Sequence, residues 1–302
     1  MIVAGFFVFG LVFGSFLNVC IYRMPRGLSV VRPRSACPSC NHPIAAYDNI
    51  PVFSWLILRG KCRHCKTRIS PRYAVVELLT GCLFAISYYA SLATPEPLAY
   101  AIKLCVFAFL LIGLVFTDAE THLLPDLLTK PGIVLGLLLS IFIPLEGPAY
   151  VILSRWGAFD WRLLSFINSL AGAIFGAAFI LGVAFLYKAL RGVEGMGMGD
   201  AKLMALIGAF LGIKLTLLVL LLATLTGSLF GIALMLIVWR KRIARRKGRS
   251  SESAAKIRAR AWQSATLIFR NFEIPFGVFL GVAAAFAAFF GAPLIDWYMR
   301  FV

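Results

Sequence analysis

Long apolar runs constrain this chain more than any other feature of its sequence. A membrane-spanning helix needs about 20 mostly apolar residues, and this 302-residue chain, 61% hydrophobic and only 14% charged, contains several such runs. A soluble domain of this composition would lack the residues for a polar surface. The sequence therefore predicts an all-α, polytopic integral membrane protein with about eight transmembrane helices, at 2–21, 74–93, 98–117, 127–145, 167–190, 201–213, 215–239 and 274–295.

Two of these runs differ from the rest. The first, "MIVAGFFVFGLVFGSFLNVCIY", has no basic residue before it and Arg23 and Arg26 after it. Because a cleavable signal peptide has the reverse order, we expect a retained first helix with its N-terminus outside. The run 201–213 is short for a full crossing. It is interpreted as a span, as a re-entrant or tilted piece, or as one continuous helix with 215–239.

The basic residues support this orientation, which makes cytoplasmic loops of 22–73, 118–126, 191–200 and 240–273. The first of these loops holds ten Lys and Arg and the last holds eleven, whereas the opposite loops hold only Arg155, Arg162 and Lys214. This bias follows the positive-inside rule, so the net charge of +17 is mainly a signal of topology. The basic run "RKRIARRKGRS" has no recognition motif beside it, and we expect no nucleic-acid partner. The 240–273 loop is interpreted as disordered or as an amphipathic helix on anionic lipid headgroups.

Four of the seven cysteines form two C-x-x-C pairs in the first cytoplasmic loop. Cys37 and Cys40 form one pair and Cys62 and Cys65 the other, with 21 residues between the pairs. This pattern predicts a tetrahedral zinc site with four thiolate ligands. Disulfides are disfavoured in a reducing compartment, and a full set of thiolates leaves no open position, so the zinc is expected to be structural. His42 and His64 are alternative ligands beside the pairs.

Two aspartates stand at the predicted cytoplasmic ends of spans. Asp118 lies in "VFTDAETHLLPD", and Asp200 follows three alternating glycines, Gly195, Gly197 and Gly199. Two adjacent carboxylates share a proton, so that one acts as a general base on water and the other as a general acid. Glycines would let a substrate backbone approach. The alternative for Asp200 is that it simply N-caps a helix beginning at Ala201.

The remaining acidic and titratable residues near these ends have simpler interpretations. Glu120, His122 and Asp126 are expected to be solvated loop residues or, for Asp126, part of a cap with Pro125. A proton shuttle is a second interpretation of His122. Glu77, near the start of 74–93, is interpreted as a partner of Arg72 or another basic loop residue, or as a substrate contact.

The ordered set of motifs resembles the bacterial type IV prepilin peptidase family. The stretches that carry the resemblance are "GSFLNVCIYRMP" (14–25), the two C-x-x-C pairs, "RYAVVELLTG" (72–81), "TDAETHLLPD" (117–126), "GMGMGDAKL" (195–203) and "IPFGVFL" (274–280). Two features depart from the family: the basic loop at 240–270 is longer than usual, and Val278 stands where the family often has Pro.

The resemblance implies an inner-membrane aspartic protease of the G-x-G-D type, with Asp118 and Asp200 as its catalytic residues and an active site that faces the cytoplasm. It implies prepilin and pseudopilin substrates, cut after a short basic leader. It further implies N-methylation of the new N-terminus with S-adenosylmethionine as the donor. No glycine-rich nucleotide motif follows a strand, so the sequence does not locate the methyl-donor pocket, and the loop with "VELLTG" is only a candidate region.

These inferences divide the chain into a first transmembrane helix (1–21), a zinc-binding loop domain (22–73) and a transmembrane peptidase core (74–302) that carries the basic loop. Two other functions compete with a peptidase. A transporter or proton relay would use Asp118 and Asp200 as ion ligands, and a zinc-stapled scaffold would have no catalysis. Neither accounts for the ordered motifs.

Overall fold

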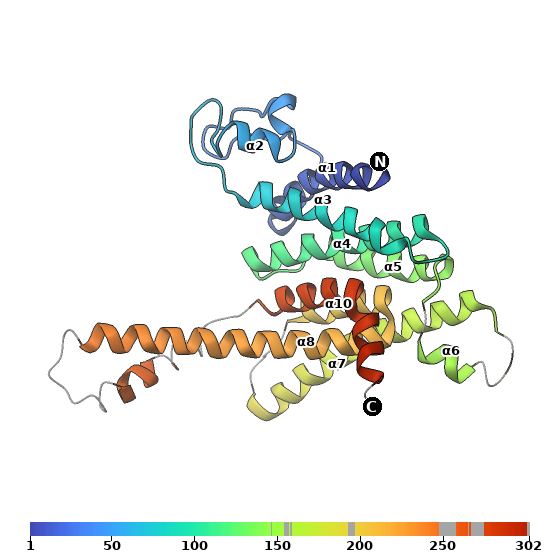
Figure 1. The fold of residues 1–302 in the computed structure, drawn as a ribbon. Helices are drawn as coiled ribbons and strands as arrows, with labels where there is room; N and C mark the ends of the chain where they lie inside the picture. The colour runs from blue at the N-terminus through green and yellow to red at the C-terminus, as the bar shows by residue number, and fades with distance from the viewer. Residues whose placement is uncertain are drawn as a thin grey trace.

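The computed structural model is all-α, as the apolar runs predict. It describes residues 1–145, 147–153, 157, 159–192, 197–247, 258–264, 266 and 275–300. The longer helices are α1 (Ile2–Arg23), α3 (Arg72–Ser91), α4 (Pro97–Thr121), α5 (Asp126–Phe142), α7 (Trp161–Arg191), α8 (Met198–Lys247) and α10 (Phe276–Met299), as Figure 1 shows. Short helices are η1 (Met24–Arg26), η2 (Ala46–Asn49), α2 (Phe53–Ile57) and α6 (Pro148–Leu153).

Within the described residues, six helices, not eight, are long and apolar enough to cross a membrane: α1, α3, α4, α7, α8 and α10. The expected span 127–145 forms α5, which has 17 residues and a proline at position 131. The expected spans 201–213 and 215–239 both lie in α8, whose two helical segments meet at a kink at Gly212. From Met198 to Leu211 that element would cover only about 21 Å at 1.5 Å per residue, whereas the hydrocarbon core is about 30 Å thick.

Gly212 is where α8 departs from helical geometry. Its φ of 72° and ψ of 174° lie outside the helical region, in a conformation that glycine adopts readily. Such a break frees backbone carbonyls that need partners at membrane depth. The Ser169 hydroxyl donates to the carbonyl oxygen of Ala209 at 2.6 Å, and the Thr216 hydroxyl donates to that of Gly212 at 2.7 Å. Hydroxyl groups thus satisfy the backbone around the break.

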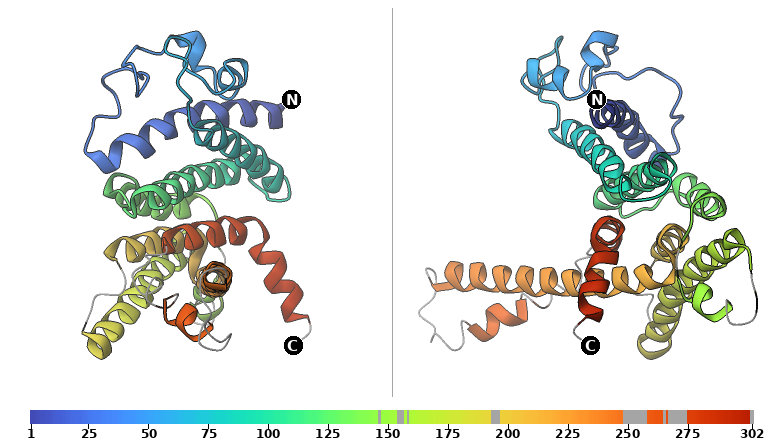
Figure 2. Two further views of the ribbon diagram at one scale, coloured as in Figure 1. Left: turned by 90° about the vertical axis from the view of Figure 1, so that its left-hand side faces the viewer. Right: turned by 45° about the vertical axis from the view of Figure 1, so that its right-hand side comes forward.

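The helices stack in layers, with α4 in the interior. In Figure 1, α1 and α3 form one layer, α4 and α5 the next, and α10, α8 and α7 the layer beyond, and Figure 2 shows the same order from two other sides. Of the candidate spans, α4 has the most buried apolar window. The main core lies between α4, α8 and α10 and includes the fully buried Phe107, Phe210, Leu206 and Leu280. A second core of Leu17, Ile21, Val76 and Ile112 joins α1 and α3 to α4.

Small residues allow α7 and α8 to approach closely. A Cβ atom at Gly208 would lie 2.1 Å from the carbonyl oxygen of Gly172, and one at Gly176 would lie 2.5 Å from that of Met204. Both distances are far below any real contact, so only glycine fits. Small residues at helix crossings are typical of membrane bundles, where van der Waals packing replaces the hydrophobic effect between helices. The close crossing fixes the first part of α8, and with it Asp200, against α7.

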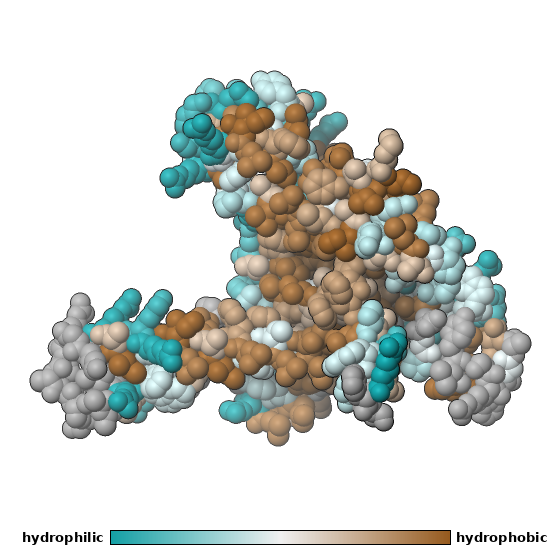
Figure 3. All heavy atoms as spheres, viewed as in Figure 1, coloured by the Kyte–Doolittle hydropathy of each residue, from teal (hydrophilic) through white to brown (hydrophobic). Residues whose placement is uncertain are grey.

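The loop between α1 and α3 forms a small module at one end of the bundle. Figure 3 shows hydrophilic residues gathered over this module and over the outer part of α8, whereas the helices between them present an apolar surface. Glu77 of α3 holds the module, because its Oε2 accepts a 2.7 Å hydrogen bond from the backbone N–H of Val52. The division of the chain at residues 21 and 73 remains a prediction.

Candidate active site

The two candidate catalytic aspartates lie at the same end of the bundle. Asp118 is in the last turn of α4, and Asp200 is in the first turn of α8. Asp118 is only 5% exposed and Asp200 is half-buried. The two side chains are close enough for the charge of Asp118 to act on Asp200. The fold thus brings together the two carboxylates that the sequence analysis selected.

The turn before Asp200 differs from the capping alternative. The helix begins at Met198, and the N–H of Asp200 donates to the carbonyl oxygen of Gly197 at 3.2 Å. Asp200 is therefore inside the first turn and does not cap a helix beginning at Ala201. A Cβ atom at Gly199 would lie 3.2 Å from Cδ1 of Leu124, whereas one at Gly197 would meet only the backbone nitrogen of Gly199, at 3.8 Å. Gly195 lies outside the described residues.

The beginning of α10 completes the surroundings of Asp118. The backbone N–H of Val278 donates to Asp118 Oδ2 at 3.1 Å, although the two residues are 160 positions apart. The neighbouring Gly277 lies directly against the same carboxylate. These two residues have no role predicted from the sequence, where the only signal for them is the matching stretch "IPFGVFL".

The other acidic residues near this end are engaged elsewhere. Asp126 accepts from Lys202 at 2.6 Å and pairs with Lys130 at 2.7 Å. The hydrogen bond from Lys130, followed by that from Lys202, holds the pKa of Asp126 below its usual range. Asp126 is exposed, as expected of a solvated residue, and it lies in the first turn of α5 directly after the N-cap Pro125, where it also forms these ion pairs. These ion pairs align the start of α5 with the start of α8.

His122 ends α4 beside Asp118. It adopts a left-handed conformation with a φ of 52°, and its N–H donates to the backbone oxygen of Asp118 at 2.9 Å. A residue in this conformation commonly closes a helix by capping a free carbonyl. His122 therefore has a local structural role, and its interpretation as a proton shuttle remains a prediction.

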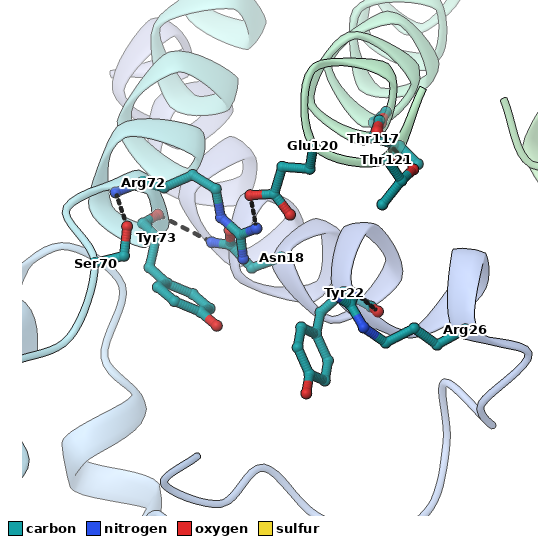
Figure 4. Close-up of polar contacts among 10 residues, drawn as sticks. Asn18, Tyr22, Arg26, Ser70, Arg72, Tyr73, Thr117, Glu120 and Thr121 are labelled. Atoms are coloured by element: carbon teal, nitrogen blue, oxygen red, sulfur yellow. Dashed lines mark hydrogen bonds and ion pairs between the residues drawn. The ribbon is translucent and has the colours of Figure 1, made fainter. Parts of the chain in front are cut away.

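Arg72 pairs with Glu120 and not with Glu77. Figure 4 shows the Arg72 guanidinium between Asn18 of α1 and Glu120 of α4, with a hydrogen bond to Glu120. Asn18 donates to the backbone oxygen of Tyr73 at 2.9 Å. This polar cluster joins α1, α3 and α4. It lies at the same end of the bundle as Asp118, because Glu120 is only two residues from Asp118 in α4. Glu77 instead binds the module through Val52.

The four cysteines of the module form one cluster, as predicted. The sulfur atoms of Cys37, Cys40, Cys62 and Cys65 all lie within 4.8 Å of one another. Those of Cys37 and Cys65 are 3.7 Å apart. Sulfur atoms around a tetrahedral zinc ion with bonds of about 2.3 Å would be about 3.8 Å apart. The donor set therefore fits a metal site.

Matching backbone turns build the two halves of this cluster. Cys37 N–H donates to His42 O at 3.0 Å and Cys62 N–H to Thr67 O at 2.9 Å, so each C-x-x-C pair closes the same kind of loop. His42 and His64 stack on each other with ring centroids 4.6 Å apart and do not join the sulfur cluster. Their role as substitute ligands is therefore not supported.

The fold and this site define a multi-pass membrane protein with an interacting aspartate pair at one end and a four-cysteine metal module beside it. The family model of the bacterial peptidase A24 N-terminal domain matches residues 8–91, and that of the type IV leader peptidase family matches residues 105–232. The chain belongs to the type IV leader peptidase family.

Several curated relatives match most of the chain. It is 34% identical to the prepilin leader peptidase/N-methyltransferase of Aeromonas salmonicida strain A449, over 97% of this chain and 92% of that protein. It is 33% identical to the protein of the same name from Burkholderia pseudomallei strain 1026b, over 95% and 84%. The match to the Neisseria gonorrhoeae protein of that name is 35% over 75% and 80%. No solved structure matches the chain.

Proposed function

We propose that this chain is a prepilin leader peptidase that also methylates the new N-terminus of its product. The observation that carries the peptidase activity is the placement of two carboxylates at one end of the bundle, Asp118 in the last turn of α4 and Asp200 in the first turn of α8. Relatives that cover nearly the whole chain are named for both activities. The substrates are prepilins or pseudopilins with a short basic leader.

The two aspartates would hydrolyse the peptide bond without a covalent intermediate. One carboxylate removes a proton from a water molecule, and the water oxygen attacks the scissile carbonyl carbon. The other carboxylic acid protonates the leaving amine as the carbon–nitrogen bond breaks. The products are the leader with a free carboxylate and the mature protein with a free α-amine. S-Adenosylmethionine would supply an electrophilic methyl group to that amine.

Zinc is the metal that we propose for the four-cysteine cluster. Four thiolates leave no coordination position for water or substrate, so the ion would be structural. A module of about 50 residues has too little core to fold well alone, and a metal ion would stabilise it. We assign the zinc no step in either reaction.

The membrane and its sidedness complete the proposal. The chain would lie in the bacterial inner membrane with the aspartates, the module and the basic part of α8 on the cytoplasmic side. The positive-inside bias supports this orientation. We propose lipid and prepilins as partners, and no nucleic acid.

Cleavage of a prepilin by the purified protein tests this function. Protein in detergent is incubated with a candidate prepilin and methyl donor, and the product is analysed by mass spectrometry. We expect loss of the leader and an increment of roughly 14 Da on the new N-terminus. An intact prepilin would favour the transporter or scaffold alternatives, and a cleaved product without the increment would limit the chain to a peptidase.

A further inference from the structure

The first turn of α10 leaves backbone N–H groups that need acceptors. The first four N–H groups of any helix have no partner within it, and α10 has no side-chain cap of its own. Asp118 of α4 supplies an acceptor. Its Oδ2 receives the N–H of Val278 at 3.1 Å, and the same N–H also reaches the carbonyl oxygen of Pro275 at 3.3 Å. The positive end of the helix dipole also favours a negative charge at this place. The carboxylate of Asp118 is thus bound by a helix distant in sequence.

Gly277 makes this contact geometrically feasible. A Cβ atom at position 277 would lie 2.7 Å from Oδ2 and 3.0 Å from Cγ of Asp118. Real Cβ atoms essentially never approach another heavy atom within 3.0 Å. Gly277 lies within the regular helix α10, so glycine is needed here for space and not for an unusual backbone conformation. Any side chain at 277 would displace the carboxylate.

We propose that the first turn of α10, through Gly277 and the N–H of Val278, positions Asp118 and keeps it as the charged member of the aspartate pair. This inference rests on the proposed function. Asp118 then acts as the general base on water. No N–H donor from the described residues binds the Asp200 carboxylate, so Asp200 holds the shared proton and delivers it to the leaving amine.

Position 278 offers a way to remove one donor with little change in fold. Proline has no backbone N–H. Proline is tolerated in the first turn of a helix, where no N–H bonds a carbonyl four residues earlier in the helix. Here it would also remove the 3.3 Å hydrogen bond from the Val278 N–H to the Pro275 carbonyl oxygen. Val278→Pro therefore removes the donor to Asp118 and keeps an apolar side chain at this position.

Steady-state cleavage of a prepilin by three variants tests the proposal. Gly277→Ala should lower kcat by about a hundredfold and leave KM within about threefold, because the substrate still binds but the base is misplaced. Val278→Pro should lower kcat by roughly tenfold, the expected loss for one hydrogen bond to a charged group. Gly281→Ala is the matched control, since a Cβ there would meet Val115 of α4 at 2.2 Å but would not touch Asp118.

Each result decides for or against the proposal. A kcat of Gly277→Ala or of Val278→Pro that equals the wild-type value would overturn it. Equal losses in Gly277→Ala and Gly281→Ala would also overturn it, because the cause would then be helix packing. A rise in KM alone would assign this turn to substrate binding and would contradict the positioning role.

A thermal measurement tests the contact without any substrate. Replacing Asp118 by Ala makes room for a Cβ atom at 277. The Tm lost in Gly277→Ala should therefore be largely restored in the double variant with Asp118→Ala. The same second change should restore nothing in Gly281→Ala. Additive Tm losses in both pairs would disprove the contact, whether or not the chain cleaves prepilins.

Discussion

Acidic side chains crowd one end of the bundle, and their partners separate them into two kinds. Asp126 forms ion pairs with Lys130 and Lys202, and Glu120 forms one with Arg72. Among the described residues, no Lys or Arg forms an ion pair with Asp118 or Asp200. A carboxylate without a fixed cation can take up and release a proton more readily. The balanced residues serve structure, and the unbalanced pair is suited to proton transfer.

Single substitutions should distinguish these two kinds. Asp118→Asn and Asp200→Asn should each abolish cleavage, a loss of at least about a thousandfold, because a pair that shares a proton needs both members. Asp126→Asn should retain activity within about tenfold. The measurement is the rate at which prepilin is shortened by variants purified from the membrane. Near-normal cleavage by either member of the pair would contradict the assignment, and complete loss in Asp126→Asn would move it to that residue.

The ion pairs of Asp126 predict a pH dependence of stability. The pKa of Asp126 in the folded protein lies below the usual value of about 3.9. The pairs therefore stabilise the fold fully above about pH 4, and this stabilisation is lost as the pH falls through the folded-state pKa. Asp126→Asn should lower the Tm at pH 7, and the difference from wild type should narrow as the pH falls below about 4 and through the folded-state pKa. A Tm difference that stays constant with pH would show that the pairs contribute nothing.

At the scale of elements, we expect the four-cysteine module to depend on its four thiolates. We expect about one zinc per chain by elemental analysis of protein purified without chelators. Cys37→Ser or Cys62→Ser should release the metal and make residues 22–73 more sensitive to limited proteolysis, because structural zinc supplies much of the folding energy of such a module. Cys20→Ser, at a cysteine buried in α1 and outside the cluster, is the control. Metal-free wild-type protein with the same protease resistance would remove the claim.

The features that the sequence predicts best are those written in short local patterns. The two C-x-x-C pairs and the apolar runs need no knowledge of distant contacts, and Asp118 and Asp200 stand out as carboxylates at span ends. The partners of these residues cannot be found in this way. The contact of Val278 with Asp118 and that of Glu77 with Val52 depend on how helices distant in the sequence pack. The runs 201–213 and 215–239 correspond to two helical segments of α8 that meet at Gly212. The first segment is too short to cross on its own, and the local pattern did not decide among the alternatives left open for it.

At the scale of the whole molecule, the cleavage and methylation sites should be separable. Asp200 lies on α8, whereas the module and "VELLTG" belong to the layer of α1 and α3. Asp200→Asn should fail to cut a full-length prepilin and should still methylate a pre-cleaved N-terminus. An α-amine has a pKa of about 7.7–8.0, so a substantial fraction is already neutral and reactive near pH 7.5.

The opposite result, cleavage without methylation, is expected for changes in the layer of α1, α3 and the module. Cys62→Ser and Gly81→Ala should tend to give cut but unmethylated product, because both changes disturb the layer of α1, α3 and the module. Mass spectrometry of the mature N-terminus reads both outcomes in one sample. Parallel loss of the two activities in every variant would indicate a single shared site.

The break at Gly212 also sets the depth of Asp200 relative to the lipid. An ordinary span answers a thicker or thinner bilayer by tilting. The segment from Met198 to Leu211 is too short to reach across, and its side chains Leu203, Leu206, Ile207 and Phe210 are buried among other helices. Its position is therefore fixed by the joint at Gly212 and the glycine crossing with α7. The outer helices can therefore tilt when the lipid acyl chains become longer or shorter. Asp200 keeps its position relative to the helices that surround it.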